Sequence, residues 1–188
     1  MSSSIWIIED DAFPWFSAVP AESIGLWLGP RVIHVRSLSK ILGPDLRLGI
    51  VSASSMIIRE IQAYRSFGPA WTSRLLQTAA ARLLANEKTH QTIQDNYLHH
   101  QEQRHEMVSA LHRNGIDIPI GEGFSFWIPV LNDDAACSYL ASQNIRVSAG
   151  HQCSLLTAPY IRFSISHLGR DFDRIASAIQ HAARKPIS

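Results

Sequence analysis

Cysteine is scarce in this chain, and its two cysteines follow no recognisable motif. They are Cys137 and Cys153 in a chain of 188 residues. Their spacing matches no zinc motif, and one pair cannot make a disulfide framework. We therefore expect a reducing compartment and no zinc site, and a single bridge between Cys137 and Cys153 is the less favoured alternative.

An excess of charge is also absent. The chain has 17 Lys and Arg against 16 Asp and Glu, which leaves a net charge of +1 with neutral histidines. This balance gives no sign of a nucleic-acid or membrane surface, and no basic recognition helix is apparent. We expect small molecules or other protein subunits as partners, with no direct binding to nucleic acid or membrane. The nine histidines lack ligand spacing, so we predict no metal site.

Long hydrophobic runs are missing too. The apolar segment at residues 5–8 has no basic leader and is far too short for a secretory signal or a membrane span. Hydrophobic residues still make up 46% of the chain, which is enough for one sizeable core or two small ones. The sequence therefore indicates a cytoplasmic protein.

What the sequence does contain is an alternation of short apolar runs with helical segments, which is typical of an α/β fold. Strands are predicted at residues 5–8, 31–35, 48–53, 124–130, 145–147 and 160–166. Helices are predicted at residues 54–67, 75–86, 89–114, 135–142 and 171–183, with Gly115 as a cap. We place a domain boundary within the long helical region, near residue 88.

Two segments with titratable side chains directly follow predicted strands. The strand at residues 5–8 is expected to be buried and parallel, with Glu9-Asp10-Asp11 at its carboxyl end. The strand at residues 31–35 runs into a turn that contains Lys40. Because catalytic groups in open α/β sheets gather at carboxyl ends of strands, Asp10 and Lys40 should lie at the same edge.

The turn after the second strand reads Arg-Ser-Leu-Ser-Lys-Ile-Leu-Gly-Pro-Asp-Leu-Arg-Leu-Gly over residues 36–49. A lysine beyond the end of a buried strand can form an imine with an aldehyde. The hydroxyls of Ser37 and Ser39 and the guanidinium of Arg47 can hold a phosphate. The segment therefore indicates a site for a phosphorylated aldehyde.

Several motifs of this chain occur in the order and approximate spacing of a known family. They are Glu9-Asp10-Asp11, Ser37-x-Ser39-Lys40, Pro44-Asp45-Leu46-Arg47-x-Gly49, Gly68-Pro69-Ala70-Trp71-Thr72-Ser73-Arg74 and Ile161-Arg162-Phe163-Ser164. This set resembles the class I/II aminotransferases, which are fold-type I pyridoxal phosphate enzymes. It is closer still to the aminotransferase-like domain of MocR-type transcriptional regulators. The resemblance implies a partial, mostly parallel large domain at residues 1–88 and a smaller α+β C-terminal domain at residues 89–188.

The resemblance also implies roles in holding pyridoxal 5'-phosphate. Lys40 would be the catalytic residue, forming the internal aldimine and moving the substrate proton. Asp10 would pair with the pyridine nitrogen, and Ser37, Ser39 and Arg47 would bind the phosphate. Asp10 could instead cap a turn, and either serine could have a local turn role, Ser39 more readily than Ser37.

Three further residues could contact substrate or cofactor, and two others depart from the family pattern. Arg162 would bind the substrate α-carboxylate, whereas a lone strand arginine is more often solvated or paired with an acid. Thr72 and Ser73 occupy a loop that approaches the neighbouring subunit's cofactor in the family, but helix capping explains them equally well. Ala12 and Phe13 stand where relatives carry a hydroxyl for the cofactor's phenolic oxygen, so transamination should be less efficient.

The family's amino-terminal half has no counterpart before residue 5, so we expect only the C-terminal half of the domain. A complete domain would be expected to form a homodimer and to bind an amino acid or another small amine or carboxylate. Three hypotheses follow: an amino-acid/2-oxo-acid aminotransferase, the effector-sensing domain of a regulator without turnover, or an inactive truncated remnant.

Overall fold

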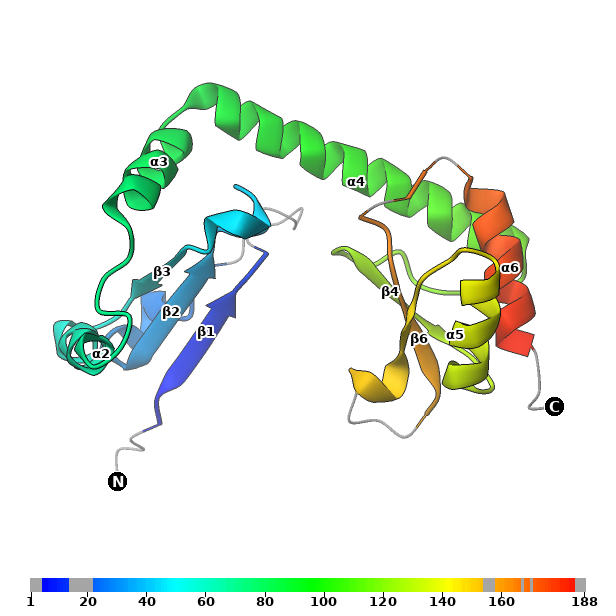
Figure 1. Cartoon of the computed structure of the whole chain (residues 1–188), viewed down its shortest axis with the longest axis horizontal. Coiled ribbons are helices and arrows are strands. Elements are labelled where there is room, and N and C mark those ends of the chain that lie inside the picture. The colour runs from blue at the N-terminus through cyan, green and yellow to red at the C-terminus, as the bar shows by residue number, and fades with distance from the viewer. Residues whose placement is uncertain (1–4, 14–21, 154–157, 167, 170, 185–188) are drawn as a thin grey trace. The chain divides into compact units, whose positions relative to one another are not determined.

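The computed structural model describes residues 5–13, 22–153, 158–166, 168–169 and 171–184. They form two compact units, residues 1–95 and 96–188, which divide within the long helix α4 (Glu87–Arg113; Figure 1). In the described residues, no helix combines the length and the apolar character needed to cross a bilayer. The assignment of residues 1–88 and 89–188 to two aminotransferase-type domains stays a prediction.

Unit 1 contains a three-stranded sheet in the order β1-β2-β3. Strands β1 (Ile7–Asp11) and β2 (Val32–Ser37) are parallel, whereas β3 (Gly49–Ser52) runs antiparallel to β2. The other elements are α1 (Gly25–Leu28), η1 (Gly29–Arg31), η2 (Pro44–Leu46), α2 (Ser55–Ser66) and α3 (Arg74–Leu84). The described sheet is therefore half parallel, not mostly parallel, because a short loop and not a crossover helix connects β2 to β3.

Strand β1 was expected to be buried, and this prediction was wrong. The acids at its carboxyl end lie within the strand, and its side chains alternate between half-buried and exposed. Ile8 is 68% exposed, so β1 is not a buried strand. It is the outer strand of the described sheet, and its partly buried side chains, Ile7, Glu9 and Asp11, share one face.

The turn that contains Lys40 is fixed by a small apolar cluster. Leu38 and Leu48 are buried at its two ends and pack with Ala80 of α3. The backbone N–H of Leu38 donates to the carbonyl of Leu48 at 3.0 Å, which closes the loop. Both ends of the turn are therefore anchored by apolar contacts with α3.

Unit 2 contains an antiparallel sheet in the order β4-β6-β5. Its elements besides α4 are β4 (Ser125–Pro129), α5 (Asp133–Ser142), β5 (Ser148–Ala149), η3 (Gly150–Gln152), β6 (Tyr160–Ser164) and α6 (Phe172–Arg184). Alternate residues of β4 and β6 are buried, and α5 and α6 cover that face of the sheet (Figure 1). The result is a continuous hydrophobic core in this unit.

The predicted helices begin and end within two residues of the observed ones, and Gly115 ends α4 with a φ of 74° as expected. The strand predicted at residues 145–147 was wrong, because pairing begins only at Ser148. Helix α5 ends in a turn in which the Ile145 N–H donates to the carbonyl of Leu140 at 2.8 Å. Asn144 has the left-handed backbone conformation in this turn, so residues 144 and 145 belong to the C-terminal cap of α5 and not to a strand.

Candidate functional site

Ser37 ends β2 and begins the turn that leads to Lys40. Its Oγ accepts a hydrogen bond from the backbone N–H of Ser39 at 3.3 Å. The local turn role therefore belongs to Ser37, not to Ser39 as expected. Since Oγ is the acceptor in this bond, the Ser37 hydroxyl proton is still available for a ligand oxygen.

Asp10 and Ser37 share one face of the sheet. Asp10 is paired with Val35 across the parallel β1–β2 ladder, and Ser37 lies two residues beyond Val35. Paired residues point to the same face and strands alternate with period two, so both side chains project to one side. Asp10 is exposed and makes no hydrogen bond or ion pair with the described residues.

Lys40 lies at the edge of the sheet where β1 and β2 end. The two strands end within a residue of each other, since Asp11 is paired with Arg36. The Lys40 Nζ is 5.6 Å from the ring centre of Phe13, just beyond β1, at cation–π distance. The structure thus brings the segment after Asp10 and the lysine turn together.

Arg47 has an unusual backbone for a residue with a side chain. Its φ and ψ are 47° and 44°, in the left-handed region, directly after η2. This conformation costs a non-glycine residue about 1 kcal/mol, and such outliers concentrate at functional sites. The bend comes immediately before the buried Leu48, which leaves Arg47 exposed beside an anchored residue.

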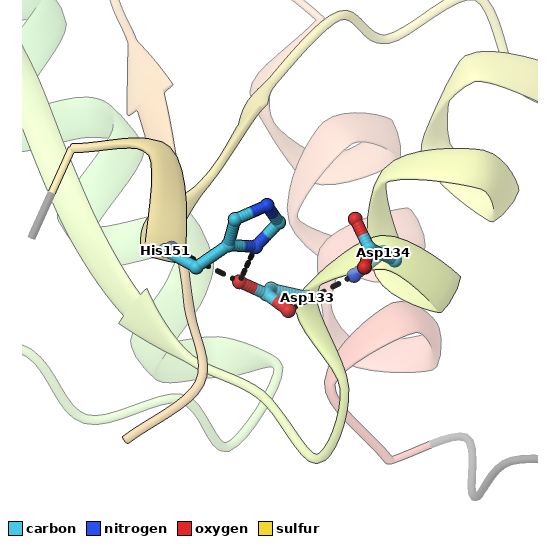
Figure 2. Close-up of side chains that lie close together, drawn as sticks. All are labelled: Asp133, Asp134 and His151. Carbon is cyan, nitrogen blue, oxygen red and sulfur yellow. Dashed lines mark hydrogen bonds and ion pairs between the residues drawn. The ribbon is translucent and has the colours of Figure 1, made fainter. Parts of the chain in front are cut away.

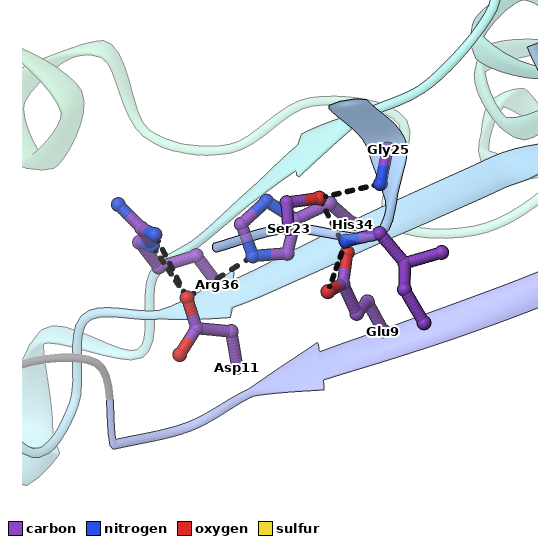
Figure 3. Close-up of polar contacts among 7 residues, drawn as sticks. Glu9, Asp11, Ser23, Gly25, His34 and Arg36 are labelled. Atoms are coloured by element: carbon purple, nitrogen blue, oxygen red, sulfur yellow. Dashed lines mark hydrogen bonds and ion pairs between the residues drawn. The ribbon is translucent and has the colours of Figure 1, made fainter. Parts of the chain in front are cut away.

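The opposite face of the same sheet carries a polar network (Figure 3). Asp11 Oδ2 accepts from Arg36 Nε at 2.9 Å and lies 3.0 Å from His34 Nε2. These contacts join the ends of β1 and β2 below the lysine turn. This role was not predicted from the sequence, although His34 and Arg36 have the same two-residue spacing as the acids at residues 9 and 11.

Glu9 connects β1 to α1 within this network. Its carboxylate accepts from the Ser23 hydroxyl at 2.5 Å and from the Ile24 N–H at 3.0 Å (Figure 3). The Ser23 hydrogen bond, followed by that of Ile24, lowers the pKa of Glu9. Glu9 thus positions a helix and is not available on the Asp10 face.

In the loop before α3, Ser73 has the helix-capping role that was the alternative to a cofactor contact. Ser73 Oγ accepts from the Leu76 N–H at 3.5 Å, as an N-cap residue does. The Thr72 hydroxyl accepts from the Arg65 guanidinium at 3.2 Å. Both side chains therefore have local partners in this chain.

Arg162 belongs to unit 2 and lies on the exposed face of β6. It is paired with Trp127 of β4 on one side and with Ser148 of β5 on the other. Its side chain lines a cavity of about 500 Å³. The other predicted site residues, Asp10, Ser37, Ser39, Lys40 and Arg47, belong to unit 1.

A buried arginine of unit 2 gave no signal in the sequence. Arg104 of α4 is 4% exposed, and its NH1 donates to the carbonyl of Gly123 at 2.9 Å. Its Nε donates to the carbonyl of Ile120, and the guanidinium stacks on the Phe126 ring at 4.0 Å. Burial lowers the pKa of Arg104. These contacts hold the loop that leads into β4, so its role is structural.

Asp133, Asp134 and His151 form a second group of titratable side chains (Figure 2). Their potential ligand atoms lie within 4.8 Å of one another. Asp133 Oδ2 already accepts from both Nδ1 and the backbone N–H of His151, at 2.8 and 3.1 Å. The hydrogen bond to Asp133 raises the pKa of His151. This contact ties the first turn of α5 to η3.

Comparison with known proteins places these features in a family. The family model for aminotransferase class I and II matches residues 2–179. The vitamin B6 salvage pathway transcriptional repressor PtsJ of Salmonella typhimurium is 26% identical over 182 residues, which cover 95% of this chain and 42% of that protein. The expected likeness to a transcriptional regulator is thus confirmed.

Solved structures show the same fold. An aromatic aminotransferase from Pyrococcus horikoshii has a TM-score of 0.80 at 19% identity and covers 95% of this chain and 50% of that one. LysN, the alpha-aminoadipate aminotransferase from Thermus thermophilus, has a TM-score of 0.80 at 21% identity with the same coverages. The chain therefore spans about half the length of the relatives it matches. Since the family model extends over nearly the whole chain, this protein belongs to the class I and II aminotransferase family.

Proposed function

We propose that this chain binds pyridoxal 5'-phosphate through Lys40 and contributes to amino-group transfer between amino acids and 2-oxo acids. The observation that carries the proposal is the anchored turn after β2, which presents Ser37, Lys40 and Arg47 on a fixed backbone. The T. thermophilus relative is complexed with N-(5'-phosphopyridoxyl)-L-leucine, which supports this choice of cofactor. In this proposal, unit 1 is part of the family's large domain and unit 2 is its smaller C-terminal domain.

The residues of the turn fit a phosphorylated aldehyde. Ser37 has a hydroxyl proton to donate, Ser39 adds a second hydroxyl, and Arg47 offers a forked cation from a strained backbone position. The Lys40 amine, exposed at the sheet edge, would condense with the aldehyde group, and the aldehyde oxygen would leave as water. Asp10 projects from the same face as Ser37 without a partner among the described residues, which suits a carboxylate that pairs with a protonated ring nitrogen.

When bound, pyridoxal phosphate supplies an electron sink for amino-acid chemistry. In this proposal Lys40 Nζ moves the proton at the substrate α carbon, and Arg162 holds the substrate carboxylate. Phe13 lies against Lys40 but carries no hydroxyl, and Ala12 carries none either. Neither residue can donate a hydrogen bond to a phenolic oxygen, so turnover should be slow.

A second function is the sensing of an amine or carboxylate effector without turnover. Two observations favour it: the similarity to a transcriptional repressor, and the apolar residues at positions 12 and 13. Cofactor binding through Lys40 is common to both functions. Only amino-group exchange separates them.

The test is to incubate the chain with pyridoxal phosphate, reduce with borohydride and map the modified lysine by mass spectrometry. We expect the adduct on Lys40 and its loss in K40A. The chain has two other lysines, Lys88 and Lys185. K88A is the matched control, because Lys88 is exposed on α4, and it should label like the parent chain.

Each outcome decides between the hypotheses. Labelling of Lys40 together with exchange of the amino group between an amino acid and a 2-oxo acid supports the transaminase. Labelling without exchange supports the sensor. Equal labelling of K40A and the parent chain, or no labelling at all, would contradict both and leave the inactive remnant.

A further inference from the structure

The carboxylate of Asp11 joins β1 to β2, and the proposed cofactor contacts make no use of it (Figure 3). One oxygen, Oδ2, lies 2.9 Å from Nε and 2.8 Å from Nη2 of Arg36, and 3.0 Å from Nε2 of His34. Since an ionised carboxylate only accepts hydrogen bonds, both residues of β2 donate to it. The side chains of Asp11 and His34 are each 21% exposed, so water screens these contacts only in part.

These contacts, which we call the Asp11 clamp, lie where β1 has little other support. Within the described residues β1 is an outer strand, and β2 is the strand that pairs with it. Ile8 of β1 is 68% exposed, so apolar burial contributes little to holding the strand. Asp11 and Arg36 form the last pair of the ladder, and the ends of elements open most readily. Charge-assisted hydrogen bonds at this pair therefore fix the carboxyl end of β1 against that of β2.

Each residue of the last pair has a proposed cofactor-binding residue as its neighbour in the chain. Asp10 precedes Asp11, and Ser37 follows Arg36. Because successive side chains of a strand point to opposite faces, Asp10 and Ser37 project from the face opposite the clamp. A contact that fixes the backbone at residues 11 and 36 therefore also fixes the separation of the Asp10 carboxylate from the Ser37 hydroxyl.

We propose that Asp11 is a positioning residue, which through Arg36 sets the separation of Asp10 and Ser37 to the one that pyridoxal phosphate requires. The proposal rests on the function proposed above, in which Asp10 pairs with the ring nitrogen and Ser37 binds the phosphate. A rigid ring holds these two groups of the cofactor apart, so protein groups at the wrong separation lose one contact when they make the other. A ligand that contacts only Ser37 and its turn, such as inorganic phosphate, makes no demand on the separation.

The test measures dissociation constants for pyridoxal phosphate and for inorganic phosphate on the full chain at constant ionic strength. Pyridoxal phosphate is followed by the absorbance of its bound form, and inorganic phosphate by its competition with that form. We expect D11N to raise the ratio of the first constant to the second about tenfold, because the amide keeps the size of the side chain but loses the charge-assisted hydrogen bonds. R36Q should raise the ratio similarly. The D11N/R36Q double variant should raise it no further, since both changes remove the same contact.

E60Q is the matched control, because Glu60 is an exposed acid of α2 in the same unit. It should leave the ratio unchanged. R36K keeps the charge without the planar fork, so its ratio should lie between those of the parent chain and R36Q. A merely structural role would weaken both ligands equally, so an unchanged ratio in D11N would overturn the proposal. Losses that add in the double variant, or unfolding of either single variant in circular dichroism, would overturn it as well.

Binding by the parent chain separates this inference from the cofactor function. If the parent chain is labelled on Lys40 and D11N keeps the parent's ratio, only the positioning role of Asp11 fails. If the parent chain binds neither ligand, the proposed function fails and the positioning role fails with it.

Discussion

At the scale of single residues, the two serines of the lysine turn have different surroundings. Ser37 Oγ is fixed by the N–H of Ser39, whereas no side-chain contact of Ser39 is among those described. A hydroxyl that is held in place loses less rotational freedom when it binds a phosphate. Ser37 should therefore contribute more to cofactor affinity than Ser39.

We expect S37A to raise the dissociation constant for pyridoxal phosphate about tenfold, because one hydrogen bond to a charged group is lost. S39A should change it less. The measurement is a cofactor titration followed by the absorbance of the bound form, with K40A as the blank. A larger loss in S39A than in S37A would show that Ser39 is the phosphate ligand.

At the scale of elements, α5 and η3 are connected at one point. Asn132 caps α5 by accepting from the Ala135 N–H at 2.7 Å, and Asp133 in the first turn accepts from His151. Burial by itself would raise the pKa of Asp133, but the hydrogen bonds from His151 outweigh it and the pKa is lowered. The pair therefore favours the ion-paired form of both side chains.

This connection should depend on pH. The pKa of His151 is raised above 6.5, so its contribution to stability is complete below that pH and is lost as the pH rises through the folded-state value. The pKa of Asp133 is lowered below 3.8, so its contribution is present above 3.8 and is lost as the pH falls through the folded-state value. The pair thus stabilises the fold most strongly between these limits.

We expect H151Q to lower the urea midpoint of unit 2 at pH 5.5, where the parent histidine is charged. At pH 9 the two midpoints should coincide more closely, since the parent histidine is then neutral. D134N is the control, because Asp134 is exposed and does not bond to His151 directly. A difference between H151Q and the parent chain that grows with pH would contradict the ion pair.

At the scale of the whole molecule, the two units differ in how much apolar surface they bury. The described part of unit 1 has few buried hydrophobic residues, namely Val32, Leu38, Leu48, Ala80 and Ile93. Large apolar side chains such as Trp27, Phe67 and Trp71 are exposed there. Unit 2 buries a continuous cluster of aliphatic and aromatic residues from α4, β4, α5, β6 and α6. Burial of apolar surface dominates folding stability, so unit 1 should be the less stable unit.

Hydrogen exchange measured by mass spectrometry tests this difference. Peptides from β1, β2 and β3 should exchange at least about tenfold faster than peptides from β6 and α6, because they open in a lower-energy local unfolding. The mid-part of α4 is a useful internal reference, since it crosses the boundary between the units. Equal protection of both sheets would show that burial within each unit does not set its stability.

Much of the fold could be read from local patterns. Helical periodicity and caps located the five long helices, because these signals depend on residues three or four apart. The positions of five of the six strands were also predicted, although β1 begins and ends later than expected. The family was identified from motifs whose chemistry is carried by neighbouring residues.

The α/β class, the family and the turn that contains Ser37, Lys40 and Arg47 could be predicted from the sequence alone, because each depends on patterns and motifs of residues close together in the chain. The direction of β3, the exposure of β1, the contacts of Asp11 with β2 and the cavity beside Arg162 became known only from the structure. Strand partners and cavity walls join residues that are distant in the chain, and no local pattern encodes which distant residue lies opposite.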